Sequence, residues 1–143
     1  CDISADCYFE ELRQDFEGAY YGMYFLELAD YCTRENNDER EVLKLLYQSL
    51  RALTVKSIPR RLVRCIYEIR LIVANGEFPG LPQGNFSETA LYAVEFIAGT
   101  PVEKLYTFTL KEEVIAELVQ IAEKYRRDFL PGEFHTLEIL ETL

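Results

Sequence analysis

The stretch YFEELRQDFEGAYYGMYFLELADYCT, residues 8–33, decides the fold. At helical spacing it carries two apolar stripes. The first consists of Phe9, Leu12, Phe16, Ala19, Tyr20, Met23 and Leu26, and the second of Tyr21, Tyr24, Phe25, Leu28, Tyr31 and Cys32. A helix that is apolar on two sides is usually buried. The pattern therefore predicts a helix roughly 39 Å long at the centre of a helical bundle.

Two further helices are predicted downstream of the polar segment 34–38. The second helix extends to about Leu53, and its predicted buried residues are Leu43, Leu46, Tyr47, Leu50 and Leu53. The third opens at Ser57, an N-cap candidate, with Pro59 in the tolerated first turn. Its predicted inner face is Leu62, Cys65, Ile66, Ile69, Ile72 and Val73.

A loop rich in glycine and proline, residues 75–85, separates these helices from the C-terminal part. We predict that residues 76–85 are the most mobile loop. A shorter helix follows over 87–98, and the segments 100–103 and 109–112 both have the pattern of a capping box. The second box predicts a helix with Val114, Leu118, Ile121, Ala122, Tyr125 and Phe129 inside. The tail, 134–143, is too short for an assignment. The fold class is a single all-α bundle of about five to six helices.

Charge is distributed unevenly along this acidic chain. Residues 51–70 carry a net charge of +5, whereas the whole chain carries −10, so the remaining residues carry −15. Such a chain repels nucleic acid and anionic membranes almost everywhere, so an anionic partner would have to approach this stretch. Its candidate binding residues are Arg51, Lys56, Arg60, Arg61 and Arg64.

Three interpretations of this basic stretch remain open. On a helical wheel, Arg60, Arg61 and Arg64 lie opposite the apolar face, with Tyr67 and Leu71 on the same outward side. The arginines could form a solvated surface paired with some of the chain's 25 acidic residues. They could instead form a mixed basic and apolar groove for an acidic, hydrophobic peptide. Direct phosphate contact is the third interpretation.

Several classes of function lack support in the sequence. The apolar stretches are too short and too often interrupted by charge to span a membrane, and the first residues do not have the pattern of a secretory signal. The four cysteines include no Cys-x-x-Cys pair, and His135 is the single histidine, so no zinc site is predicted. His135 has no motif partner for catalysis, and the carboxylate pairs Glu10/Glu11 and Glu112/Glu113 are adjacent and point apart. We expect no enzyme activity, no metal and no cofactor, and buried thiols in a reducing cytoplasm.

Several segments, in this order, resemble the C-terminal helical domain of the RecO family of bacterial recombination mediators. They are Ala19–Asp30, Leu45–Leu53, Tyr67–Leu71 leading into Gly76–Pro79, Thr89–Ile97, Pro101–Phe108 and Leu137–Leu140. The resemblance covers nearly all 143 residues, and the later segments resemble the Firmicutes branch of the family. Many members place zinc-binding cysteine pairs after the Gly-x-x-Pro turn, whereas the segment 76–87 has no cysteine, so the zinc module is absent.

The resemblance implies a function in DNA repair and homologous recombination, in the cytoplasm at the nucleoid. Its implied partners are the acidic C-terminal tail of single-strand-binding protein, the RecR protein and single-stranded DNA. Most DNA binding in the family is implied for an N-terminal OB-fold, which nothing in these residues resembles. An all-helical ligand-binding or dimerisation domain of a bacterial regulator is the alternative, and an apolar cavity with converging polar groups would favour it.

Overall fold

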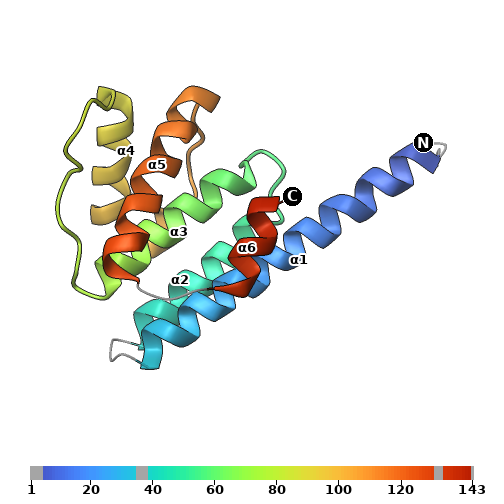
Figure 1. Cartoon of the computed structure of the whole chain (residues 1–143), viewed down its shortest axis with the longest axis horizontal. Coiled ribbons are helices and arrows are strands. Elements are labelled where there is room, and N and C mark those ends of the chain that lie inside the picture. Colours follow the sequence, from blue (N-terminus) through green and yellow to red (C-terminus); the bar gives the residue numbers. More distant parts are fainter. Residues whose placement is uncertain (1–4, 35–38, 131–133, 143) are drawn as a thin grey trace.

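The described residues form helices and no strand. The computed structural model describes residues 5–34, 39–130 and 134–142. These residues form six α-helices and a short 3₁₀ turn (Figure 1), namely α1 (Ala5–Arg34), α2 (Glu39–Ala52), α3 (Arg60–Ala74), α4 (Glu88–Gly99), η1 (Val102–Lys104), α5 (Glu112–Phe129) and α6 (His135–Thr142). The predicted all-α fold is confirmed.

The helix at the centre is α3, not α1. It packs against α1, α2, α4 and α5, while α1 and α2 form an antiparallel hairpin and α6 lies on α1 (Figure 1). Nine of the fifteen residues of α3 are buried. The expectation that the N-terminal helix is central is therefore wrong, because α1 buries one side whereas α3 is enclosed on several.

Only one of the two apolar stripes of α1 lies in the core. Tyr21, Tyr24, Phe25, Leu28 and Cys32 are buried, as the second stripe predicts. In the first stripe, Phe16, Met23 and Leu26 are 66%, 50% and 52% exposed, contrary to the prediction, whereas Tyr20 is partly buried against the core. The side chains of Phe9 and Leu12 lie outside the described residues. A regular apolar period thus identified the helix correctly without identifying the side that is covered.

The predicted buried face of α2 is also displaced. Leu43 and Tyr47 are 56% and 59% exposed. The buried residues of α2 are Val42, Leu45, Ser49 and Ala52. Of the other predicted residues, Leu53 is buried and Leu46 and Leu50 are partly buried against the core. The prediction is therefore wrong for Leu43 and Tyr47, because the centre of the covered face lies nearer to Leu45 and Ser49.

Only one of the N-caps predicted at Ser57, Ser87 and Thr109 is observed in the structure. The Ser87 side chain accepts a hydrogen bond from the Ala90 N–H at 3.2 Å, so this N-cap is confirmed. The N-caps of α3 and α5 are Pro59 and Lys111, neither of which makes a side-chain cap. The predicted caps at Ser57 and Thr109 are wrong, because each lies two residues before the observed N-cap of its helix.

The loop between α3 and α4 is present where the sequence predicts it. Gly76 and Gly80 have φ angles of +74° and +90°, a region that residues with a Cβ rarely adopt. Gly76 thus ends α3, and its N–H donates to the Val73 carbonyl at 2.9 Å. The tail that the sequence left unassigned forms α6.

Candidate functional site

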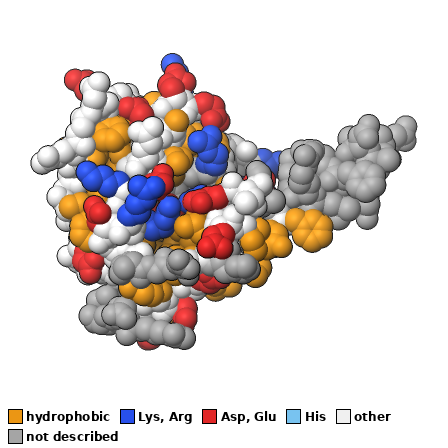
Figure 2. All heavy atoms as spheres, viewed as in Figure 1, with side chains coloured by type: hydrophobic (Ala, Val, Ile, Leu, Met, Phe, Trp, Pro, Cys, Tyr) orange, Lys and Arg blue, Asp and Glu red, His pale blue; other side chains and the backbone are white. Residues whose placement is uncertain are grey.

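The basic residues of the stretch 51–70 do not form one surface. Arg51, Lys56 and Arg61 are exposed, whereas Arg60, Arg64 and Arg70 are half-buried. Figure 2 shows Lys and Arg side chains gathered over α3 and α5, with acidic side chains among them. The stretch therefore divides into residues that face solvent and residues that hold the fold together.

Two of the α3 arginines form pairs at the surface. The Arg60 Nε donates to the Leu53 carbonyl at 3.3 Å, and its guanidinium lies 4.0 Å from the Glu17 carboxylate. Arg61 pairs with Glu112 at 3.2 Å, and both side chains are more than half exposed. An exposed pair of this kind contributes little to stability. Arg61 fits the interpretation of a solvated charge pair.

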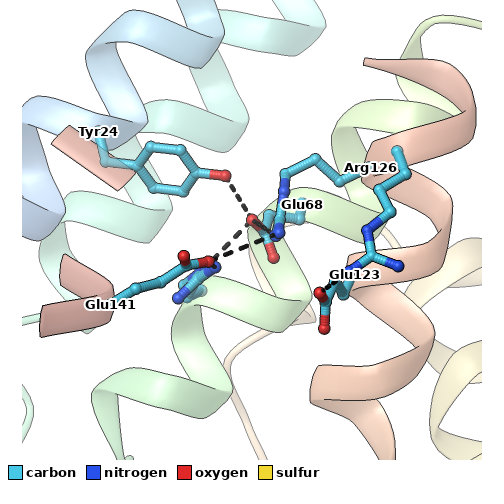
Figure 3. Close-up of polar contacts among 7 residues, drawn as sticks. Tyr24, Glu68, Glu123, Arg126 and Glu141 are labelled. Atoms are coloured by element: carbon cyan, nitrogen blue, oxygen red, sulfur yellow. Dashed lines mark hydrogen bonds and ion pairs between the residues drawn. The ribbon is translucent and has the colours of Figure 1, made fainter. Parts of the chain in front are cut away.

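The strongest electrostatic feature is a buried cluster around Glu68, which is 1% exposed (Figure 3). One of its carboxylate oxygens accepts hydrogen bonds from the Tyr24 hydroxyl, from Arg126 at 3.0 Å and from Arg64 at 3.4 Å. The Glu141 carboxylate of α6 lies 3.8 Å from both arginines. The cluster thus joins α1, α3, α5 and α6.

Tyr24 is held as the hydrogen-bond donor in this cluster. Burial raises the pKa of its phenol far above the usual value, and the neighbouring Glu68 carboxylate raises that pKa further. The Arg64 guanidinium lies over the Tyr24 ring, 5.6 Å from its centroid. The Arg64 guanidinium therefore makes its contacts inside the fold. The prediction that Arg64 belongs to an outward binding surface is wrong.

Arg70 closes the end of α4. Its Nη1 donates to the carbonyl oxygens of Ile97 at 2.9 Å, Ala98 at 3.1 Å and Thr100 at 2.7 Å. The last carbonyls of a helix have no partner within the helix, and a cation there also complements the helix dipole. Arg70 fixes the C-terminus of α4 against α3.

Tyr67 and Leu71 are fully buried, each with 0% of its surface exposed. The Tyr67 ring stacks on Phe25 with centroids 4.2 Å apart, and its hydroxyl donates to the Phe25 carbonyl at 2.6 Å. The expectation that both residues point outward is wrong. It assumed one buried side of α3, whereas helices pack on several sides.

An open groove of about 470 Å³ lies beside the exposed part of the basic stretch. Its lining includes Arg51, Val55 and Ile58 from the end of α2 and the turn after it, and Tyr106 and Phe108 from the segment before α5. Three threonines, Ser57, Gln48 and Ala52 complete the lining. The Arg51 guanidinium also lies over the Tyr47 ring, 5.7 Å from its centroid. This groove therefore combines a cation, apolar surface and hydrogen-bonding groups.

Sequence reasoning found Arg51 and the neighbouring exposed Lys56, which does not line the groove, but it missed the part of the lining that comes from residues 106–109. Tyr106 and Phe108 lie some fifty residues further along the chain, and a hydrogen bond between Tyr106 and Ser49 attaches their segment to α2. The only hint in the sequence was the pair of aromatic residues itself, and apolar periodicity could not assign that pair to the groove.

A second, smaller pocket of about 130 Å³ lies over the Glu68 cluster and is lined mainly by charged residues. Neither pocket is the closed apolar cavity that the ligand-binding alternative requires.

No metal-binding arrangement occurs among the described residues, which contain no cluster of three or more His, Cys, Asp or Glu side chains. Cys32 and Cys65 are both buried and on different helices. Glu112 and Glu113 are exposed in the first turn of α5. The side chains of Glu10, Glu11 and His135 lie outside the described residues.

The buried thiols lead to a prediction about reactivity. Burial raises the pKa of the Cys65 thiol to about 12 and that of the Cys32 thiol to about 11. The thiolate is the reactive species, so we expect iodoacetamide at about pH 8 to leave both cysteines unmodified in native protein and to modify them in denaturant. Mass spectrometry of the digested protein measures this.

The raised thiol pKa values also make the free energy of unfolding depend on pH. Folding favours the neutral thiols, so their contribution is present below the ordinary thiol pKa of about 8.5 and is lost as the pH rises above it. Rapid modification of Cys65 in native protein would show that α3 is not enclosed as described.

Comparison with known proteins places this architecture in a family. None of the described helices has the combined length and apolar character needed to cross a membrane. No curated protein and no solved structure matched the chain. A family model described as "Recombination protein O C terminal" matches residues 13–84, half of the chain, which includes α1 from residue 13, α2, α3 and most of the loop that follows. The chain belongs to this family, the C-terminal domain of the recombination protein RecO, whose function is in DNA recombination and repair.

Proposed function

We propose that this domain is a non-enzymatic mediator platform that holds the acidic C-terminal tail of single-strand-binding protein in the groove beside Arg51. The observation that carries the proposal is the groove itself, which places a cation next to apolar side chains on an otherwise acidic chain. Membership of the RecO family supports a function in recombination. An acidic tail that ends in an apolar residue has complementary chemistry.

Charge directs the approach of such a tail. An anionic segment is repelled by most of the surface, because the chain outside residues 51–70 carries −15. Arg51 and Lys56 are exposed near one another in sequence, at the end of α2 and in the turn that follows. Arginine binds carboxylates in a bidentate manner, so Arg51 is suited to the tail's terminal carboxylate. We expect these charges to raise the association rate and its salt sensitivity.

Apolar contacts would retain the tail once it is bound. Val55 is 43% exposed, and Phe108, which also lines the groove, is half-buried. Side chains of this kind accept an aromatic or aliphatic residue, and losses of apolar contact act mainly on the dissociation rate. Within the same proposal, RecR is a second protein partner, and single-stranded DNA is bound mainly by an OB-fold of the RecO type.

The test is a charge reversal of the two exposed residues. We expect Arg51→Glu with Lys56→Glu to weaken binding of a labelled tail peptide at least tenfold at low salt, about 1.4 kcal/mol. Because both side chains are exposed, the melting temperature should stay unchanged. Fluorescence anisotropy measures the affinity. Arg60 and Arg64 are unsuitable for this test, since reversing Arg64 would place a carboxylate against the buried Glu68.

The matched control reverses exposed charge elsewhere. Lys124 and Arg127 are exposed on α5, and Lys124→Glu with Arg127→Glu makes the same change in net charge at residues that do not line the groove. This pair should leave tail affinity within about twofold. Equal losses for both double variants would mean that net charge alone governs binding, and an unchanged affinity for the groove variant would reject the groove.

A further inference from the structure

The outward side of α1 carries an apolar face that no other described helix covers. Phe16, Met23 and Leu26 are 66%, 50% and 52% exposed, and Ala19 between them is exposed as well. On a helical wheel this face lies opposite the core-facing residues, of which Phe25 and Leu28 are fully buried. A soluble helix normally places polar residues on the side that faces water.

The spacing of this face has the period of a helix-pairing seam. Phe16, Ala19, Met23 and Leu26 follow one another at intervals of three, four and three residues, the spacing that lets two helices pack along their length. In the sequence, Phe9 and Leu12 continue the same spacing toward the N-terminus. With 30 residues, α1 is about 45 Å long, and its N-terminal part extends beyond the other helices (Figure 1). We call Phe16, Ala19, Met23 and Leu26 the α1 seam.

The charges beside the α1 seam indicate what kind of helix fits it. Residues 15–33 contain four acids and no Lys or Arg. Glu17 lies 4.0 Å from Arg60, whereas Asp15 and Glu27 border the seam on its two sides, at roughly 60° from its centre on a helical wheel. The seam therefore presents apolar surface edged by carboxylates. Basic side chains next to an apolar stripe are its electrostatic complement.

We propose that the α1 seam docks an amphipathic helix of a partner protein whose apolar stripe is bordered by Lys and Arg. The net charge of −10 disfavours a second copy of this acidic chain, and it disfavours nucleic acid for the same reason. The proposal is independent of the groove beside Arg51, which carries the opposite charge. The domain would thus have one surface for an acidic tail and another for a basic helix.

Three synthetic peptides of equal length test the chemistry of this surface. The first is an amphipathic helix with Leu at the seam positions and Lys or Arg on both borders. The second replaces those bordering cations by Glu, and the third has the composition of the first in scrambled order. Anisotropy titrations with the full chain at low salt should show binding of the first peptide at least ten times tighter than of the others. If the scrambled peptide binds as tightly as the first, general charge attraction explains the binding, and the proposal is overturned.

Variants then locate the binding. Phe16→Gln with Met23→Gln should weaken the basic peptide at least tenfold, because glutamine removes apolar contact and keeps helix propensity. Leu81→Gln with Tyr92→Gln is the matched control, since both residues are exposed and apolar, at 43% and 70%, away from α1. That control should leave the affinity unchanged, as should the Arg51→Glu with Lys56→Glu variant, so this result is separate from the outcome for the groove.

Sedimentation velocity decides between the proposed partner and self-association. The chain should remain a monomer across the concentrations used in the titrations. A dimer that forms with rising concentration and disappears in the Phe16→Gln with Met23→Gln variant would show that a second copy covers the seam, and it would overturn the proposal.

Discussion

Glu68→Gln is expected to lower the free energy of unfolding by about 3–5 kcal/mol, the cost of removing one partner from a buried ion pair. The carboxylate of Glu68 compensates Arg64 and Arg126, whose side chains are only 17% and 11% exposed. With glutamine, the two guanidiniums would depend on Glu141, which lies 3.8 Å from each and is 56% exposed. Urea denaturation followed by circular dichroism measures the change.

The control for Glu68 is the same substitution at an exposed pair. Glu112 is 75% exposed and lies 3.2 Å from Arg61, so Glu112→Gln should cost no more than about 1 kcal/mol. A loss at Glu68 as small as that at Glu112 would show that the cluster is solvated and that its arginines are available to external anions.

Tyr67→Ala is expected to destabilise the fold by about 3–5 kcal/mol, as large-to-small substitutions of buried aromatic residues do. Tyr67 is fully buried and its ring stacks on Phe25, so alanine would leave a cavity between α1 and α3. Tyr67→Phe keeps the ring and loses the hydroxyl that donates to the Phe25 carbonyl. It should cost only about 0.5–1.5 kcal/mol.

A surface aromatic residue provides the comparison for Tyr67. Tyr92 is 70% exposed on α4, and Tyr92→Ala should change the free energy of unfolding by no more than about 0.5 kcal/mol. If Tyr67→Ala instead leaves stability unchanged and accelerates dissociation of the tail peptide, Tyr67 faces a partner and the description of α3 is wrong.

The positions of the helices could be predicted from the sequence because each element has a clear period or boundary. The first helix, predicted over 8–33, is observed over Ala5–Arg34, and the Ser87 cap starts α4 as expected. The covered side was predicted correctly for α3 and α5, where residues such as Ile66 and Leu118 are buried as expected, but only in part for α1 and α2. Phe16 and Leu43 repeat as regularly as any core residue and yet face solvent, since periodicity gives the direction of an apolar face without its neighbours.

The candidate site was predictable only where it depended on local charge. Arg51 and Lys56 are exposed as expected. Arg64 and Arg70 are not available, because their partners are residues such as Glu141 and the Ile97 carbonyl, which lie far along the chain. A helical wheel of α3 alone does not contain Glu141, so it placed Arg64 in water, and the charge count of residues 51–70 gave no sign that Arg70 binds the end of α4. The groove required Tyr106 and Phe108, which only the fold brings near Arg51.

The Glu68 cluster also bears on where the domain can be divided. Residues 13–84 match the family model and contain Tyr24, Arg64 and Glu68, whereas Arg126 and Glu141 come from α5 and α6. A truncation after residue 84 would leave the Glu68 carboxylate with one arginine and would expose the side of α3 that packs on α5. We therefore expect residues 13–84 not to fold on their own. On the ribosome, the charge cluster stays incomplete until the last helix has been synthesised.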